Sequence, residues 1–279
     1  MQKLIAFGRE VFQHFSKSNT FQEGAALAYY TVFSLLPMLI IVVSIFGMIW
    51  GKAAVSGELY EGLVSTLGET SAQGIEQIIK QQHQNHTSVW TAIIGFVTLA
   101  LGASGMFNQL HTAFNNIWGL ESPQRNGLLN YLIKHASSFV LLIITFFLLF
   151  LSVTIHSYLV RYGDVLPDHF QLTLLAEHLV SFFLVSLIFA ILFKVLGDAI
   201  VHWKIALFGG LFTALLFIIG KFAIGMYIGH SKISTTFGSA SVLALVMVWV
   251  YYTSQMLFLG ASFVYVLGKR LGQEIAAVS

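Results

Sequence analysis

Charge is the scarcest property of this sequence. Asp, Glu, Lys and Arg make up 9% of its 279 residues, whereas a soluble globular domain carries roughly 25%. Hydrophobic residues make up 57%, and the charges lie mostly between long apolar runs. Such a pattern is typical of a chain whose solvent is lipid, so we expect no second, soluble domain.

Several classes of function lack the residues that they need. Cysteine is absent, which excludes a disulfide framework, a thiolate metal ligand and a cysteine nucleophile. The net charge of +2, without basic runs, argues against binding to nucleic acid. No Walker loop, G-x-S-x-G, H-E-x-x-H or dinucleotide fingerprint occurs. We therefore predict a protein that is not an enzyme and has no cofactor and no metal site.

Long apolar segments dominate what remains. A helix needs about 20 apolar residues to cross a bilayer. Segments that meet this length lie at 24–50, 88–118, 135–160, 174–197, 204–229 and 237–268. The sequence therefore predicts an all-α fold: a polytopic membrane protein with a bundle of six transmembrane helices. The membrane domain is expected at 24–270, between a cytoplasmic amphipathic segment at 1–23 and a cytoplasmic tail at 271–279.

The basic residues set the predicted orientation. With the N-terminus inside, the inner segments hold Lys3, Arg9, Lys17, Arg125, Lys134, Lys194, Lys204, Lys269 and Arg270. The outer segments hold only Lys52, Lys80, Arg161 and Lys232. By the positive-inside rule, nine basic residues inside against four outside favour both termini in the cytoplasm. The loop 51–87 then lies outside, and its leucines recur at helical spacing, which predicts short amphipathic helices there.

The N-terminal segment 1–23 is polar and amphipathic. Leu4, Phe7, Val11, Phe12 and Phe15 alternate at helical spacing with Lys3, Arg9 and Lys17. This pattern predicts a helix on the cytoplasmic surface rather than a cleavable signal peptide.

Polar residues inside the predicted spans are the default functional candidates, because they are costly in lipid. In the first span Tyr30, Ser34 and Pro37 share a stripe, and Pro37 predicts a kink. Ordinary packing around a membrane proline explains this stripe equally well. Near the inner end of the last span, Gln255 lies at the depth of Tyr29, which suggests a polar pocket opening inward.

The second span carries two stripes. Its small-residue stripe predicts close packing against another helix and consists of Gly95, Thr98, Gly102, Gly105 and Gln109. Its amide-rich stripe consists of Ser104, Asn108, His111, Asn115 and Trp118. Buried amides need hydrogen-bond partners, so either a cavity lining or a cytoplasmic hydrogen-bond network explains the second stripe.

Lys221 is the only charged residue well inside a predicted span. It either snorkels to the outer surface or contacts an anionic group. No Asp or Glu lies near the middle of any predicted span, so the carboxylate relay typical of proton-driven pumps is missing.

The order of these motifs resembles the YihY/BrkB family of bacterial membrane proteins. The stretch from Ala25 to Pro37 is similar to its first-span signature, and Asn115-Asn116-Ile117-Trp118-Gly119 is similar to its Asn-x-Ile-Trp ending. The strongest similarity runs from Lys204 to Arg270, although Ser262 replaces a common glutamate. The resemblance implies six helices, an inner-membrane location and the transport of a lipid or amphiphile. Members were once labelled ribonuclease BN, which these residues do not support.

The leading hypothesis is a transporter or flippase-like exporter of an amphipathic or lipidic molecule across the bacterial inner membrane. Its expected partners are membrane lipids, with a second copy or an envelope protein as further candidates. The hypothetical path runs between the first, second, fifth and sixth spans. Its candidate residues are Tyr29, Tyr30, Ser34, Pro37, Asn108, His111, Asn115, Trp118, Lys221, Tyr227, Trp249 and Gln255. The alternative is a non-transporting envelope assembly or resistance factor that acts through the loop 51–87.

Deletion of this loop distinguishes the two hypotheses. An assembly factor loses its resistance phenotype when residues 51–87 are removed, whereas substitution of its intramembrane polar residues has no effect. A transporter depends on those polar residues. The measurement is growth under envelope stress, with membrane insertion of each variant as the control.

Overall fold

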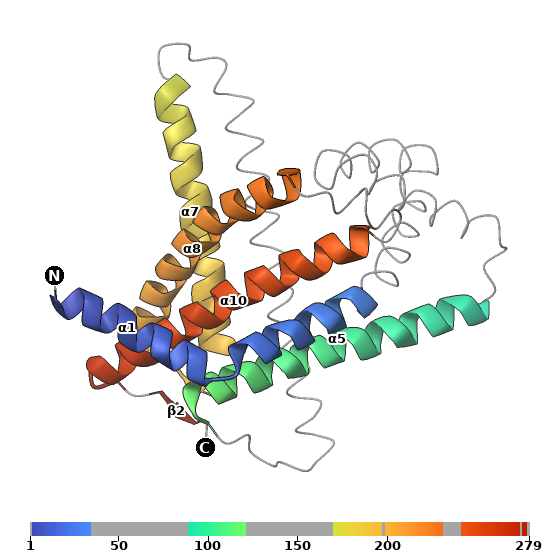
Figure 1. The fold of residues 1–279 in the computed structure, drawn as a ribbon, viewed down its shortest axis with the longest axis horizontal. Coiled ribbons are helices and arrows are strands. Elements are labelled where there is room, and N and C mark those ends of the chain that lie inside the picture. The colour runs from blue at the N-terminus through green and yellow to red at the C-terminus, as the bar shows by residue number, and fades with distance from the viewer. Residues whose placement is uncertain are drawn as a thin grey trace. The chain divides into compact units, whose positions relative to one another are not determined.

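The computed structural model describes residues 2–34, 89–120, 170–196, 199–230, 241–273 and 275–277 (Figure 1). Most of these residues are helical. The labelled helices are α1 (Gln2–Lys17), α5 (Val89–Trp118), α7 (Phe170–Val195), α8 (Trp203–His230) and α10 (Ser241–Arg270). A further helical segment covers 20–34. The strands β1 (Ala199–Ile200) and β2 (Ala276–Ala277) form one short antiparallel ladder.

The helices coincide with the apolar segments of the sequence to within a few residues. α5, α7, α8 and α10 match the predicted segments 88–118, 174–197, 204–229 and 237–268. The helical character of the fold is thus confirmed for the described residues. Residues 35–50 of the predicted first span, the segment 135–160 and the loop 51–87 lie outside them, so six spans and a helical loop stay predictions. The β1–β2 ladder was not predicted, because two-residue strands leave no period in a sequence.

Length and hydropathy identify candidate membrane spans within the described helices. Trp203–Ile224 in α8 and Leu243–Arg270 in α10 are long and apolar enough to cross a bilayer, and Leu179–Val195 in α7 is a shorter apolar helix. The exposed side chains of α8 recur on one side at helical spacing: Phe208, Leu215, Ile219, Phe222 and Met226. An exposed side this apolar is typical of a helix that faces lipid.

The chain forms two compact units. We call the first the terminal unit; it comprises Met1–Glu23, Leu110–Gly220 and Gln255–Ser279. The second, the central unit, comprises Gly24–Gln109 and Lys221–Ser254.

Aromatic side chains form the core of the terminal unit. The ring of Phe114 on α5 lies 6.0 Å from that of Phe193 on α7 and 6.4 Å from that of Phe258 on α10. All three side chains are fully buried. On the other side of α10, Phe263 stacks on Phe212 of α8 with their ring centroids 4.3 Å apart. Dispersion between such rings is a major attraction between helices in lipid, where apolar burial alone gives little advantage.

Small residues let the helices of the terminal unit approach closely. A Cβ atom on Gly210 of α8 would overlap the carbonyl oxygen of Ser186 and lie 2.9 Å from the backbone nitrogen of Ala190, both on α7. A Cβ atom on Gly260 of α10 would overlap the hydroxyl of Thr213 on α8. Glycine is therefore required where α8 crosses both of its neighbours.

The small-residue stripe of α5 allows a similarly close approach between helices in the central unit. A Cβ atom on Gly102 would lie 2.9 Å from the Cβ atom of Ser34, and one on Gly105 would lie 2.6 Å from the ring of Tyr30. The predicted packing role of this stripe is confirmed at these two glycines.

Substitution of Gly210 by alanine tests the α7–α8 contact. Backbone atoms surround the site and cannot move aside, so Gly210→Ala is expected to destabilise the protein by about 1–3 kcal/mol. Gly8→Ala is the matched control, because nothing lies within 4 Å of a Cβ atom there and α1 should gain roughly 0.5–1 kcal/mol. The measurement is the unfolding midpoint in detergent. Equal midpoints for the two variants would contradict the contact.

Candidate functional site

The structure distributes the predicted path residues over both units. His111, Asn115, Trp118 and Gln255 belong to the terminal unit, and we call them the terminal group. The path residues of the central unit form what we call the central group: Tyr29, Tyr30, Ser34, Asn108, Lys221 and Trp249. Pro37 lies outside the described residues, and Tyr227 lies on α8 with its side chain outside them. That all twelve line one path stays a prediction.

The end of α5 is the best-defined polar feature of the terminal unit. The last carbonyls of a helix have no partner within it and need one from elsewhere. Here the amide of Leu120 donates to the carbonyl of Asn115 at 2.9 Å, and the amide of Gly119 donates to that of Asn116 at 3.3 Å. Gly119 has a φ of 65°, so the helix ends in a Schellman motif that favours glycine at this position.

The next carbonyl of α5 is bonded by the N-terminal helix. Nε2 of His14 on α1 lies 2.6 Å from the carbonyl oxygen of Ile117. A carbonyl only accepts, so this nitrogen carries the proton and donates. The His14 ring also stacks on Tyr265 of α10, with centroids 4.2 Å apart and planes within 5°. One side chain of α1 therefore contacts both α5 and α10.

Side chains of the terminal group make further bonds between helices. The indole of Trp118, 2% exposed, donates to the carbonyl of Ala261 on α10 at 3.2 Å. The amide nitrogen of Gln255 donates to the carbonyl of Thr20 at 3.2 Å. His111 and Asn115 are buried on the same side of α5 as Trp118. The indole of Trp118 and the amide nitrogen of Gln255 therefore join helices of the terminal unit, whereas Oε1 of Gln255 is buried and has no hydrogen-bond partner among the described residues.

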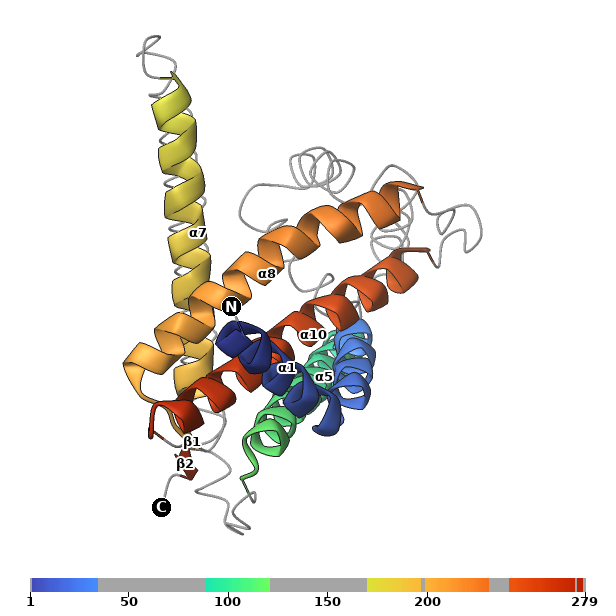
Figure 2. The same cartoon turned by 60° about the vertical axis from the view of Figure 1, so that its left-hand side comes forward.

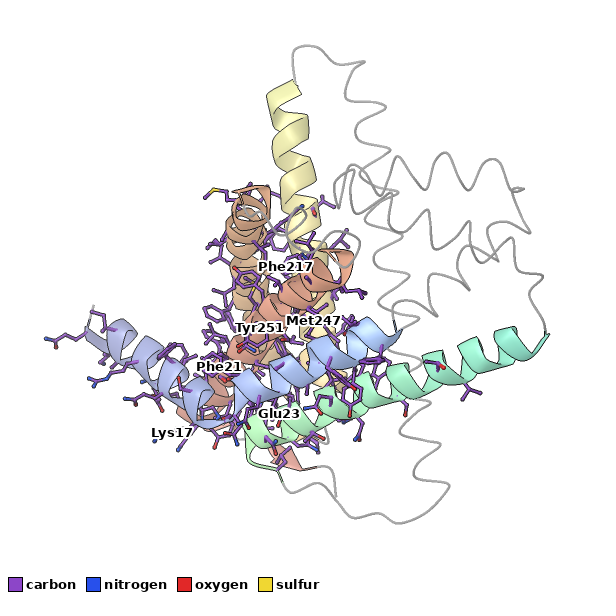
Figure 3. All side chains as sticks on the ribbon, turned by 45° about the vertical axis from the view of Figure 1, so that its right-hand side comes forward. Lys17, Phe21, Glu23, Phe217, Met247 and Tyr251 are labelled. Atoms are coloured by element: carbon purple, nitrogen blue, oxygen red, sulfur yellow. The ribbon has the colours of Figure 1, made fainter. Side chains whose placement is uncertain are left out.

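Two residues that join the N-terminal region to α5 were not predicted from the sequence. The carboxylate of Glu23 accepts a hydrogen bond of 2.8 Å from the amide of Asn116, and Figure 3 shows Glu23 beside α5. His14 was missed as well. Both lie within the segment 1–23, which was interpreted only as a surface helix.

A local signal for this junction is present in the sequence. Asn19 has a φ of 52°, in the left-handed region where asparagine is enriched, and it separates α1 from the helical segment 20–34. Thr20 and Glu23 then match the spacing of a capping box. In the structure the Thr20 hydroxyl instead donates to the carbonyl of Phe15 at 3.0 Å, which closes the turn. The helix begins at residue 20, earlier than the predicted 24.

The central group is partly packed and partly accessible. Ser34 is buried and Tyr30 half-buried against α5, where the neighbouring Thr31 hydroxyl lies 3.7 Å from the sulfur of Met106. Tyr29 is 54% exposed, and its ring lies 4.6 Å from that of exposed Phe33.

The remaining central residues come from three helices. Asn108 on α5 and Lys221 on α8 are exposed, and Trp249 on α10 is 47% exposed. Lys221, Trp249 and Tyr29 offer an ammonium, an indole and a phenol, each on an apolar stem or ring. Such side chains suit a molecule that has a polar and an apolar part. Within the described ranges, no three His, Asp or Glu side chains lie together as metal ligands would.

Two helices long and apolar enough to cross a bilayer, one of them with an exposed apolar side, are typical of a helical membrane protein. The chain belongs to the family of the virulence factor BrkB, whose family model matches residues 11–278. This confirms the resemblance noted in the sequence.

Relatives of this chain are described as membrane proteins. A UPF0761 membrane protein of Haemophilus influenzae is 24% identical over 276 residues and is matched over 99% of both chains. UPF0761 membrane proteins of Teredinibacter turnerae and Saccharophagus degradans are 27% and 25% identical, over 95% and 96% of this chain. The chain spans 61% of the length of these last two relatives. No solved structure matches it.

Removal of the indole donor tests the bond between α5 and α10. Trp118→Phe keeps an aromatic ring but removes the hydrogen bond and leaves a small void, so we expect a loss of about 1–3 kcal/mol. Asn116→Ala removes an exposed bond and should cost about 0–1 kcal/mol. Unfolding midpoints in detergent measure both. A larger loss for Asn116→Ala would contradict the assigned role of Trp118.

Proposed function

We propose that this protein is a transporter or flippase-like exporter of an amphipathic or lipidic molecule in the bacterial inner membrane, with both termini in the cytoplasm. The observation that carries the proposal is Lys221. It is an exposed cation within the apolar span Trp203–Ile224, in the same compact unit as exposed Tyr29 and Asn108.

A lysine in an apolar membrane helix carries a free-energy cost that some interaction must offset. Its cost at the centre of a membrane helix is about 2.5–3.5 kcal/mol and falls toward the ends, where the side chain can snorkel. Among the residues that the structure describes, Lys221 has no ion-pair partner. An anionic group on the transported molecule would supply one.

The surface around Lys221 is suited to the apolar part of the same molecule. Phe222 is 71% exposed and Met226 is 67% exposed. Ile218, one turn before Lys221, is also exposed. An acyl chain lying along α8 would contact these side chains while its headgroup meets the ammonium, so a single helix offers both halves of an amphiphile a partner.

The terminal group has a different role in this proposal. The indole of Trp118 and the amide nitrogen of Gln255 are bonded to other helices, so we assign these two side chains to holding the helices of the terminal unit together. The proposed topology draws support from the same unit. The salt bridge between Glu10 of α1 and Arg270 at the end of α10 keeps the two terminal regions together. The count of basic residues favours the cytoplasm for that side.

Native mass spectrometry with lipid analysis of the purified protein tests the proposal. We expect wild-type protein to retain an anionic lipid or amphiphile in excess of its share in the membrane. Lys221→Gln should reduce that retention by a factor of about 10–100, because a charge-assisted hydrogen bond contributes on the order of 1.5–3 kcal/mol. Lys221→Arg should preserve it. Lys204→Gln, an exposed lysine at the start of the same helix, is the matched control and should leave it unchanged.

Measurements of transport and resistance in cells can contradict the transport proposal. If Lys221→Gln and Asn108→Ala fold normally and leave transport and resistance intact, the transport proposal is wrong. The loop 51–87 would then be the next region to test.

A further inference from the structure

Helix α1 presents three different sides. Phe7, Val11 and Phe15 face the protein: Val11 and Phe15 are buried, and the ring of Phe7 meets that of Phe263 on α10 at 5.3 Å. Ile5 and Phe12, seven residues apart and hence on one side, are 64% and 61% exposed. A third side is polar and exposed and consists of Gln2, Arg9, Gln13 and Lys17.

The contacts of α1 fix its depth relative to the span in α10. The guanidinium of Arg270, the last residue of that span, lies 2.6 Å from the carboxylate of Glu10 and 4.9 Å from the ring centroid of Phe7. Phe263 lies seven residues before Arg270, which is about 10 Å along a helix. α1 thus packs against the last two turns of α10 and crosses them (Figures 1 and 2). Because the candidate span of α10 ends at Arg270, we expect a helix at this depth to lie at the boundary of the membrane.

Other side chains of the terminal unit mark the same boundary. Trp203, 52% exposed, precedes Lys204 at the start of α8. Leu271, 58% exposed, follows Lys269 and Arg270 at the end of α10. Exposed aromatic and apolar residues beside basic ones at helix ends are typical of a membrane–water interface.

The charge of α1 identifies what covers its exposed apolar side. The helix carries Lys3, Arg9 and Lys17 against the single acid Glu10, and that acid pairs with Arg270. Lys17 points out from the end of the helix (Figure 3). Exposed apolar residues flanked by uncompensated cations complement an anionic lipid surface. We propose that α1 lies in the plane of the bilayer surface, with Ile5 and Phe12 among the acyl chains and its cations on anionic headgroups.

This surface is independent of the proposed transport. It lies in the terminal unit, and it contacts the lipids of the surrounding membrane rather than a transported molecule. It anchors the N-terminal region whether or not the central group moves a substrate.

Spin labelling of the full chain tests where α1 lies. The sequence has no cysteine, so Phe12→Cys and Ile5→Cys each provide a single labelling site, and Gln13→Cys is the matched neighbour on the polar side. The protein is placed in vesicles of equal parts phosphatidylglycerol and phosphatidylcholine. At positions 5 and 12 we expect collisions with oxygen to exceed those with a water-soluble nickel complex several-fold, and the reverse at position 13.

Two results would overturn the position of α1. More frequent collisions with the nickel complex than with oxygen at both positions 12 and 13 would place both in water. A label at position 12 that is immobilised and shielded from both reagents would show that protein, such as a second copy, covers this side.

The headgroup preference has its own test. The purified protein is incubated with the same lipid mixture, and the retained phosphatidylglycerol is compared with the retained phosphatidylcholine. Arg9→Gln and Lys17→Gln should each lower this ratio about fivefold, since a cation near an anionic surface contributes roughly that factor. Lys194→Gln is the control, because that ammonium is already bonded to the carbonyl of Val201. An unchanged ratio in the Arg9→Gln/Lys17→Gln double variant would overturn the proposed binding of anionic lipid.

Discussion

The requirement that every helix end find partners for its last carbonyl groups governs the terminal unit. At the end of α5 these partners are the amides of Leu120 and Gly119 and the imidazole of His14. An intramolecular hydrogen bond contributes about 0.5–1.5 kcal/mol net, so the three bonds together matter for a protein of marginal stability. α10 ends in the same way, with the amide of Gln273 bonded to the carbonyl of Gly268 at 2.9 Å.

This requirement also explains why the N-terminal helix belongs to the membrane domain. His14 satisfies α5 and stacks on α10, so α1 cannot leave without exposing a carbonyl and losing a ring contact. The same attachment holds α1 at the level of Arg270, where its exposed apolar side meets the bilayer surface. Satisfying a helix end and anchoring the chain at the membrane are therefore consequences of one set of contacts.

The polar residues of the chain divide according to what their atoms already bind. Trp118 and Gln255 are hydrogen-bonded between helices, where they set geometry. Lys221 and Tyr29 are exposed, and among the described residues Lys221 has no ion-pair partner. Exposed residues such as Lys221 and Tyr29 are therefore better candidates for function than residues whose polar atoms already join helices. A polar atom that joins two helices can bind another molecule only if its existing hydrogen bond is broken.

The sequence by itself determined the positions of α5, α7, α8 and α10, the family and the close packing at Gly102 and Gly105, because hydropathy and small-residue spacing are local properties of a helix. It also indicated which residues are polar within the apolar segments. Only the tertiary structure decided which of these are hydrogen-bonded. The indole of Trp118 donates to a carbonyl 143 residues away, and the amide of Asn116 donates to the carboxylate of Glu23 on another helix. The pairing of β1 with β2 and the attachment of α1 were equally invisible in the sequence. Such contacts join segments that are distant along the chain, and no periodicity within either segment encodes its partner.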